Sequence, residues 1–272
     1  MLVPKVGWVS FRPCRALAGR KSSRISHSRA GRWHIAFAVI PDPVPAPGTG
    51  GVVGVDRGVA VAVALSAGEM TSPGGLSLKE AERLLRLQRR LARAAAGSNR
   101  RHKMKALIAG LKAKDAGRRK DWVERTSADL PARFDVIRVE NLNIKAMTLS
   151  ARTTVAELGR NVARKAGLNR GILKSGWCLL VARLEQKVPG RVEKVKAACR
   201  SQTCNPCKHI ASDRRKSQAT FVCVAWRHRA NADVNPARNI AAGPGVTARA
   251  DRRVLARSVE REPQHGRPPQ VA

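Results

Sequence analysis

The chain has 272 residues, with 53 Lys and Arg against 19 Asp and Glu, and a formal net charge of +34 at pH 7. An excess of this size repels itself unless a polyanion neutralises it, so DNA or RNA is the expected partner. No apolar run approaches the length of a bilayer span, which argues against a membrane protein and leaves an anionic membrane surface as the weaker alternative partner. Six cysteines at irregular spacing do not form a secreted disulfide framework, and they indicate metal binding in a reducing compartment.

The first 50 residues are predicted to form strands followed by a linker. Residues 5–12 and 33–40 are rich in aromatic and β-branched side chains, which is typical of strands, and a basic, turn-rich connection separates them. Residues 41–50, PDPVPAPGTG, are predicted to be a linker because Pro and Gly interrupt regular structure. This stretch marks a domain boundary.

Residues 51–130 begin with two predicted strands and continue with two predicted helices. The run VVGVD is followed by a turn at Arg57 and Gly58 and by a second apolar run. Ser77 and Glu80 have the spacing of a capping box, which predicts a helix start. Gly97 interrupts the apolar helical pattern, so an antiparallel helical pair is expected over residues 77–130.

This helical pair is strongly basic. Residues 79–125 contain sixteen Lys and Arg but five acids. The imbalance of sign favours a surface that follows nucleic-acid phosphates, although a solvated helix face is the alternative interpretation. The candidate nucleic-acid-binding residues here are Arg89, Arg90, Arg100, Arg101, Lys103, Arg118 and Arg119.

The second half of the chain is predicted to alternate strands and helices. Residues 134–140, FDVIRVE, are expected to form a short buried strand that ends in an acid, and residues 191–197 another strand. Two helices are expected within residues 150–190 and a short one over residues 231–240. The Arg- and Pro-rich tail beyond it is expected to be disordered.

Three acids occur in similar local contexts. Asp56 ends VVGVD, Glu140 ends DVIRVE, and Asp233 opens the short helix. Three converging carboxylates offer the hard oxygen ligands that Mg²⁺ needs for phosphodiester hydrolysis. Spacing alone leaves the alternative open, in which the strand-end acids are turn residues and Asp233 is a helix cap.

Three cysteines approach the pattern of a zinc ribbon. Cys204 and Cys207 form a C-x2-C pair, and Cys223 follows after fifteen residues, but Trp226 holds the fourth position. Candidates for the fourth Zn²⁺ ligand are His228, His209 and Cys199. The alternative is a loop that has lost its metal.

The basic run between the cysteines is a further candidate nucleic-acid contact. It consists of Arg214, Arg215 and Lys216. A solvated loop is the alternative interpretation.

Taken in order, three motifs resemble those of the TnpB (OrfB) proteins of bacterial insertion sequences. They are GVDRGVAVAVALSAGE, VIRVENLNIKAM, and the interleaved cysteine segment that ends in NADVNPARNI. The resemblance covers roughly residues 33–243. Two departures are Trp226 at the fourth cysteine position and Lys208 and Arg227 where the family usually has Gly.

The resemblance implies an RNA-guided DNA endonuclease with an α/β, RNase H-like (RuvC) domain. It assigns Asp56, Glu140 and Asp233 as the catalytic, Mg²⁺-binding carboxylates. It also implies a guide RNA and a DNA target that is read by base pairing, in a bacterial cytoplasm near the nucleoid. A catalytically inactive DNA- or RNA-binding remnant is the main alternative, and a structural zinc-ribbon protein of an RNA assembly is a weaker one.

The resemblance further implies a division of the chain into segments, with a front that is short relative to the family. The expected segments are a C-terminal part of a wedge-like β domain (1–40), a linker (41–50), a RuvC-like core (51–200) with a helical insertion (77–130), a degenerate zinc ribbon (201–229), a last RuvC segment (230–243) and a tail (244–272).

Overall fold

The computed structural model describes residues 2–3, 7–12, 19, 22–151, 159, 161–197, 199–210 and 219–243. The chain divides into two units, Met1–Asp42 with Gly75–Gly117, and Pro43–Gly74 with Arg118–Ala272. The long helix α2 (Asn99–Arg133) begins in the first unit and ends in the second. The expected disordered tail and the basic run at 214–216 lie outside the described residues.

The first unit contains two antiparallel strand pairs. β1 (Leu2–Val3) pairs with β2 (Gly7–Trp8), and β3 (Ser22–His27) pairs with β4 (Trp33–Ala38). The strand expected over residues 33–40 is therefore confirmed. The segment between residues 12 and 33 was expected to be an irregular connection. This expectation was wrong, because β3 lies in it. Ile25 is the only apolar residue of β3, so the strand has no hydrophobic periodicity and is defined by its pairing with β4.

The first unit also contains the predicted helical pair, α1 (Leu78–Ala92) and the first part of α2. Ser77 and Glu80 form the expected capping box. Leu87, Ile108 and Leu111 are buried between the two helices. The helix that was expected to end near residue 130 continues to Arg133.

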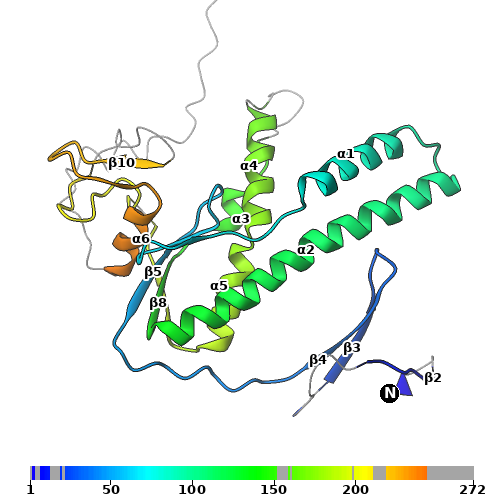
Figure 1. Cartoon of the computed structure of the whole chain (residues 1–272), viewed down its shortest axis with the longest axis horizontal. Helices are drawn as coiled ribbons and strands as arrows, with labels where there is room; N and C mark the ends of the chain where they lie inside the picture. Colours follow the sequence, from blue (N-terminus) through cyan, green and yellow to red (C-terminus); the bar gives the residue numbers. More distant parts are fainter. Residues whose placement is uncertain are drawn as a thin grey trace, which may run out of the picture. The chain divides into compact units, whose positions relative to one another are not determined.

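The second unit is built on a five-stranded mixed sheet with the order β7-β6-β5-β8-β9 (Figure 1). Its strands are β5 (Val52–Asp56), β6 (Val63–Leu65), β7 (Met70–Thr71), β8 (Val136–Glu140) and β9 (Val192–Val195). β5, β6 and β7 form an antiparallel meander, whereas β8 is parallel to both β5 and β9. β5, β6, β8 and β9 lie within runs that were predicted to be strands, whereas β7 was not predicted.

Helices cover both faces of this sheet. On one face, Val53, Val55, Ile137 and Val139 pack with side chains of α2 and of α5 (Trp177–Lys187) in a single core. On the other face lies α6 (Val234–Ala241), which packs on β5, β6 and β8. The two helices expected within residues 150–190 are confirmed as α4 (Val162–Ser175) and α5, and Gly176, with φ +82°, separates them.

Three smaller elements complete the second unit. α3 (Ile144–Met147) follows β8, and the hairpin of β10 (Thr220–Val222) and β11 (Arg229–Asn231) precedes α6. The helix that was expected over residues 231–240 begins at Val234, because Asn231 is the last residue of β11. None of the helices in the described ranges is both long and apolar enough to cross a membrane.

Candidate functional site

Asp56 and Glu140 lie at the same end of two neighbouring parallel strands. In the register of β5 and β8, Gly54 is opposite Arg138, and Val55 is opposite Val139. Asp56 and Glu140 are the next residues on each strand, and both are half-buried. Because side chains alternate along a strand, both acids share the sheet face of Gly54, which is the face that α6 covers.

Helix α6 packs so closely on β5 that only glycine fits beneath it. A Cβ atom on Gly54 would lie 2.0 Å from the carbonyl oxygen of Ala237. The guanidinium of Arg138 donates to the carbonyl of Ala241, at the other end of the same helix, at 2.5 Å. The C-terminal half of α6 therefore lies over Gly54 and Arg138, and Asp233 precedes the first residue of the same helix.

Asp233 does not cap α6. Its side chain makes no capping hydrogen bond, whereas the side-chain oxygen of Asn231 accepts from the N–H groups of Asp233 (2.9 Å) and Val234 (3.1 Å). The alternative of a plain side-chain cap is not supported, because the carboxylate of Asp233 makes no capping hydrogen bond. The capping requirement of the helix does not explain an acid at position 233.

Two buried arginines affect the charge at the strand ends. Arg57 is 9% exposed, donates to the backbone carbonyl of Glu140, and has an Nε–H without a hydrogen-bond partner. Burial raises the pKa of Glu140, while the positive charges of Arg57 and Arg200 oppose the rise. Burial lowers the pKa of Arg57, and Glu140, Cys178 and Asp56 oppose this shift. Acidic and basic side chains therefore lie close together at the strand ends, where they are partly shielded from water.

The cysteine segment forms two copies of the same tight turn. We define residues 204–209 as the first knuckle and residues 223–228 as the second knuckle. In each, the N–H of the fifth residue donates at 2.9 Å to the carbonyl of the first cysteine. These fifth residues, Lys208 and Arg227, have φ of +57° and +58°, in the left-handed region that favours glycine. The turn is kept although glycine is absent from both.

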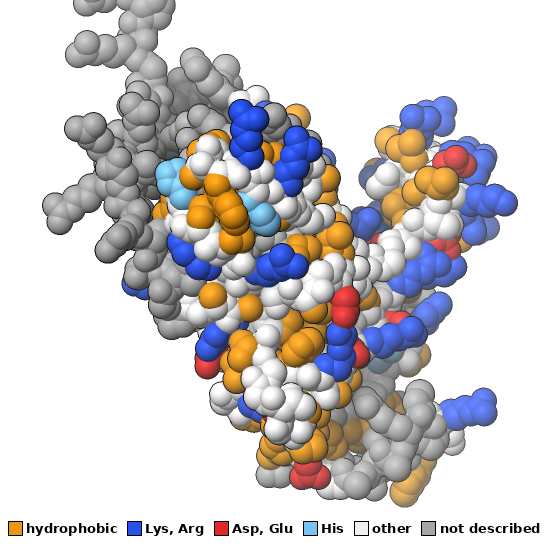
Figure 2. All heavy atoms as spheres, turned by 60° about the vertical axis from the view of Figure 1, so that its left-hand side comes forward, with side chains coloured by type: hydrophobic (Ala, Val, Ile, Leu, Met, Phe, Trp, Pro, Cys, Tyr) orange, Lys and Arg blue, Asp and Glu red, His pale blue; other side chains and the backbone are white. Residues whose placement is uncertain are grey.

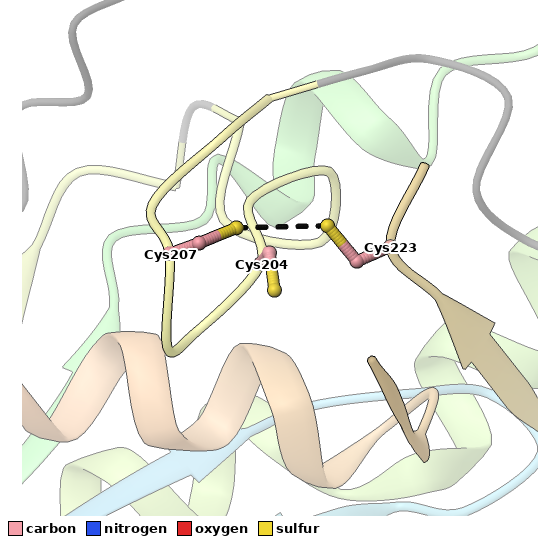
Figure 3. A group of neighbouring side chains, drawn as sticks. All are labelled: Cys204, Cys207 and Cys223. Carbon is pink, nitrogen blue, oxygen red and sulfur yellow. Dashed lines mark hydrogen bonds between the residues drawn. The ribbon is translucent and has the colours of Figure 1, made fainter. Parts of the chain in front are cut away.

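The two knuckles bring three thiols together (Figure 3). The sulfur atoms of Cys204, Cys207 and Cys223 all lie within 4.8 Å of one another, and those of Cys207 and Cys223 are 3.5 Å apart. The indole of Trp226 stacks on the ring of His228, with 5.5 Å between the ring centroids.

Trp226 therefore occupies the sequence position of the fourth cysteine without providing a thiol. The suggested fourth ligands His228, His209 and Cys199 do not belong to the thiol group. Three thiols in contact are a donor set that suits a soft or borderline cation such as Zn²⁺. Among the described residues this is the only close group of three or more His, Cys, Asp or Glu side chains, so Asp56, Glu140 and Asp233 do not form a comparable one.

Burial and hydrogen bonds in the knuckles shift the pKa values of two of the thiols. Burial raises the pKa of the Cys204 thiol, and hydrogen bonds from the Cys207 N–H and the Trp226 indole oppose the rise. Burial alone would likewise raise the pKa of the Cys223 thiol, but hydrogen bonds from the backbone of Trp226 and Ala225 bring that pKa below its ordinary value. Lower thiol pKa values favour the thiolate that binds metal.

The basic residues predicted to contact nucleic acid differ in their surroundings. Arg89, Arg90, Arg100 and Lys103 are exposed on α1 and α2, whereas Arg118 and Arg119 are half-buried. Arg101 instead donates to the carbonyls of Leu91 and Ala94, both at 3.0 Å, and so completes the C-terminal end of α1. Lys and Arg side chains far outnumber acidic ones on the surface in Figure 2.

Several residues around the candidate site were not singled out from the sequence. They are Arg57, Arg200, Asn231, Asn235 and Asn239. The last two are four residues apart on α6 and almost fully buried. Two asparagines at helical spacing among the apolar residues of a short helix were the available signal.

Two family models match the chain. The model described as "Probable transposase" (OrfB of IS605) matches residues 34–151. The model described as "Cas12f1-like, TNB domain" matches residues 177–240, which include both knuckles and α6 as far as Ile240.

Two curated proteins are similar over most of the chain. "Putative RNA-guided DNA endonuclease InsQ" of Escherichia coli (strain K12) is 35% identical over 97% of this chain and 67% of its own length. A "Putative RNA-guided DNA endonuclease" of Streptomyces pristinaespiralis is 28% identical over 88% of this chain and 59% of its own length. A cryo-EM structure of a Cas12f1–sgRNA–target DNA complex matches with a TM-score of 0.37 and 20% identity, over 77% of this chain and 53% of that one.

Proposed function

The chain belongs to the OrfB (TnpB) family of insertion-sequence proteins, and we propose that it is an RNA-guided DNA endonuclease that needs Mg²⁺ and uses Asp56, Glu140 and Asp233. One observation carries the choice of residues. Two of the acids end adjacent parallel strands on one sheet face, and the third begins the helix that covers that face. In this assignment, acids from three distant segments meet at one edge of a rigid sheet.

We assign an RNase H-like (RuvC) fold to the core. Support comes from the sheet, in which an antiparallel meander is extended by two parallel strands with helices on both faces. In this assignment α1 and much of α2 form the helical insertion, the two knuckles form the degenerate ribbon, and α6 is the last RuvC segment. Residues 1–40 correspond to the last part of a wedge-like β domain.

The side chains at the strand ends fit a divalent cation because carboxylate oxygens are the ligands that Mg²⁺ prefers. When bound, Mg²⁺ would supply water activation and stabilisation of the leaving oxygen in phosphodiester hydrolysis. The protein has to present Asp56, Glu140 and Asp233 in their ionised form. Arg57 and Arg200 favour ionised Glu140 against the effect of its burial, so they prepare this carboxylate for the cation.

The partners follow from charge and family. A net charge of +34 suits a protein that holds a guide RNA and a DNA target together. Exposed basic residues of the helical pair are the proposed phosphate contacts in this chain. As in CRISPR effectors, base pairing with the guide would read the target sequence.

We assign a Zn²⁺ ion to Cys204, Cys207 and Cys223, with a structural role. Each knuckle provides at least one thiol, so an ion would join the two. His228 could become the fourth ligand only by leaving its stack on Trp226. A solvent molecule in the fourth position requires no such change.

The second candidate function is nucleic-acid binding without cleavage, as in a remnant of such an enzyme. Trp226 at the fourth ribbon position is the observation that favours it. It predicts salt-sensitive binding of RNA and DNA and no cleavage with any divalent cation.

The deciding experiment is cleavage of labelled single-stranded DNA by the full chain with its co-purified RNA, in Mg²⁺ or in EDTA. Asp56→Ala should remove the metal-dependent cleavage. Asp121→Ala is the matched control, because Asp121 is an exposed acid of α2 in an ion pair with Arg125. Cleavage that persists in Asp56→Ala, or that disappears equally in both variants, would contradict the assignment. A folded wild-type protein that binds RNA but never cleaves would favour the second candidate.

A further inference from the structure

Helix α6 has two buried sides that contact different structures. One side lies on the sheet at Gly54, beneath Ala237. The other side carries Asn235 and Asn239, which are 1% and 0% exposed. Two buried amides on one short helix are costly unless their polar groups are paired. Their partners are therefore informative.

Both asparagines are bonded to the residues that flank Cys204. The side-chain oxygen of Asn235 accepts from the N–H of Asn205 at 3.0 Å, and its amide donates to the carbonyl of Thr203 at 2.8 Å. The amide of Asn239 donates to the same carbonyl at 2.8 Å, and its oxygen accepts from the Asn205 side chain at 3.2 Å. Four hydrogen bonds thus fix Asn205 of the first knuckle, and Thr203 just before it, to the side of α6.

The second knuckle is attached to the beginning of the same helix. β10 ends at Val222, directly before Cys223, and pairs with β11. β11 ends at Asn231, whose side chain caps α6 at Asp233 and Val234. The first knuckle is therefore bonded to the flank of α6, and the second leads through β11 and Asn231 into its N-terminus.

We propose that the thiol cluster and the three carboxylates are thermodynamically coupled through α6, with Asn235 and Asn239 as the positioning residues. An ion bound by Cys204, Cys207 and Cys223 would hold the two knuckles together and fix the helix that begins at Asp233. The loaded thiol cluster then raises the affinity of the carboxylates for a divalent cation. This inference rests on the carboxylate assignment proposed above.

The physical reason is that the thiols belong to both knuckles. Among the described residues, the second knuckle reaches α6 through β10 and β11, and the first reaches it through the hydrogen bonds of Asn235 and Asn239. The thiols of Cys207 and Cys223 touch, and an ion would bind all three thiols together. The hydrogen bonds between the first knuckle and α6 can transmit the constraint that an ion places on the knuckle. If either the knuckle or the helix moved, buried polar groups would lose their partners. Loss of supporting contacts around a metal site commonly costs ten- to a hundred-fold in metal affinity.

The test measures Mn²⁺ binding by the full chain, with Mn²⁺ as a spectroscopic substitute for Mg²⁺. The thiol cluster is first loaded with Zn²⁺, or emptied with a zinc-selective chelator, and loading is checked by thiolate absorbance with Cd²⁺. Zinc should tighten Asp56-dependent Mn²⁺ binding by about ten-fold. Mn²⁺ should tighten Zn²⁺ binding by the same factor, because coupling is reciprocal.

Variants separate positioning from a general loss of structure. Asn239→Ala should reduce the response to zinc while thiolate absorbance is kept. Asn205→Ala removes one hydrogen bond from the knuckle side and should give a smaller reduction in a protein that folds. Asn99→Ala is the control, because Asn99 is exposed at the start of α2. Hydrogen exchange of the α6 amides should slow on zinc loading in the wild type.

The outcomes distinguish the coupling from the proposed function. Asp56-dependent Mn²⁺ binding that is indifferent to zinc, or an unchanged zinc response in Asn205→Ala and Asn239→Ala, refutes the coupling alone. Absence of Asp56-dependent Mn²⁺ binding in both forms refutes the carboxylate site and the coupling together. Failure of the thiols to take up Cd²⁺ or Zn²⁺ refutes the coupling. Coupled binding without DNA cleavage would support the coupling and count against the nuclease.

Discussion

A single methyl group at Gly54 should displace the helix that carries Asp233. In Gly54→Ala the new Cβ would lie 2.0 Å from the Ala237 carbonyl oxygen and 2.4 Å from the Ala241 nitrogen, whereas ordinary contact begins at 3.4 Å. Both are backbone atoms, so no side-chain rotation relieves the overlap. Helix α6 has to retreat by about 1.4 Å, and overpacking of this kind destabilises a protein by roughly 1–3 kcal/mol or more.

The same displacement should affect catalysis more than stability. A misplacement of about 1 Å at a reacting centre can reduce the rate on the order of a hundred-fold. Gly54→Ala is therefore expected to lose Mg²⁺-dependent cleavage while it still unfolds cooperatively in urea at a lower midpoint. Gly110→Ala is the control, because a Cβ on Gly110 meets nothing within 4 Å. It should gain about 0.5–1 kcal/mol from helix propensity. Wild-type stability and cleavage in Gly54→Ala would refute the reasoning.

Four further substitutions test the charge and the knuckles. Burial raises the pKa of Glu140, so its ionised form destabilises the cation-free fold as pH rises through that pKa. Glu140→Gln should be as stable as the wild type below the ordinary carboxyl pKa and increasingly more stable between that pKa and the raised one. Above the raised pKa the difference should be about 1.4 kcal/mol per unit of the rise, and the variant should be inactive in cleavage. Trp226→Cys should raise Zn²⁺ affinity at least about ten-fold in chelator competition by completing four thiols, and an unchanged affinity would argue against a ribbon. Lys208→Gly and Arg227→Gly relieve left-handed backbone and should each add about 1 kcal/mol in urea unfolding; a loss would show that the knuckles need these side chains.

The sequence predicted those parts of the fold that depend on local patterns. The capping box at Ser77 and the apolar runs ending at Asp56 and Glu140 were sufficient, because each signal lies within one element. The strand β3 was missed because it has one apolar residue, and its register comes from β4. The role of Asp233 could not be decided locally either. Whether an acid caps a helix depends on its neighbour, and Asn231 forms the cap here.

The surroundings of the candidate site depend on long-range contacts, which periodicity does not predict. Arg57 is adjacent to Asp56 in sequence, but its contact with the Glu140 carbonyl requires the parallel pairing of β5 with β8. Gly54 within a buried strand was a usable signal of close backbone approach. The sequence does not predict which element packs against Gly54, and the structure identifies this element as α6.

Arg200 connects these long-range contacts. Its side chain donates to the carbonyls of Asn239 and Gly243 at the C-terminal end of α6, and its charge acts on Glu140. It lies in the segment that leads directly into the first knuckle. A buried charge is costly unless it is paired, and here the pairing requires that the knuckle segment, α6 and β8 be in place together. Any displacement of the first knuckle that moved Arg200 would therefore change both the support of α6 and the charge balance of Glu140, so the cysteine segment can influence the carboxylates electrostatically as well as mechanically.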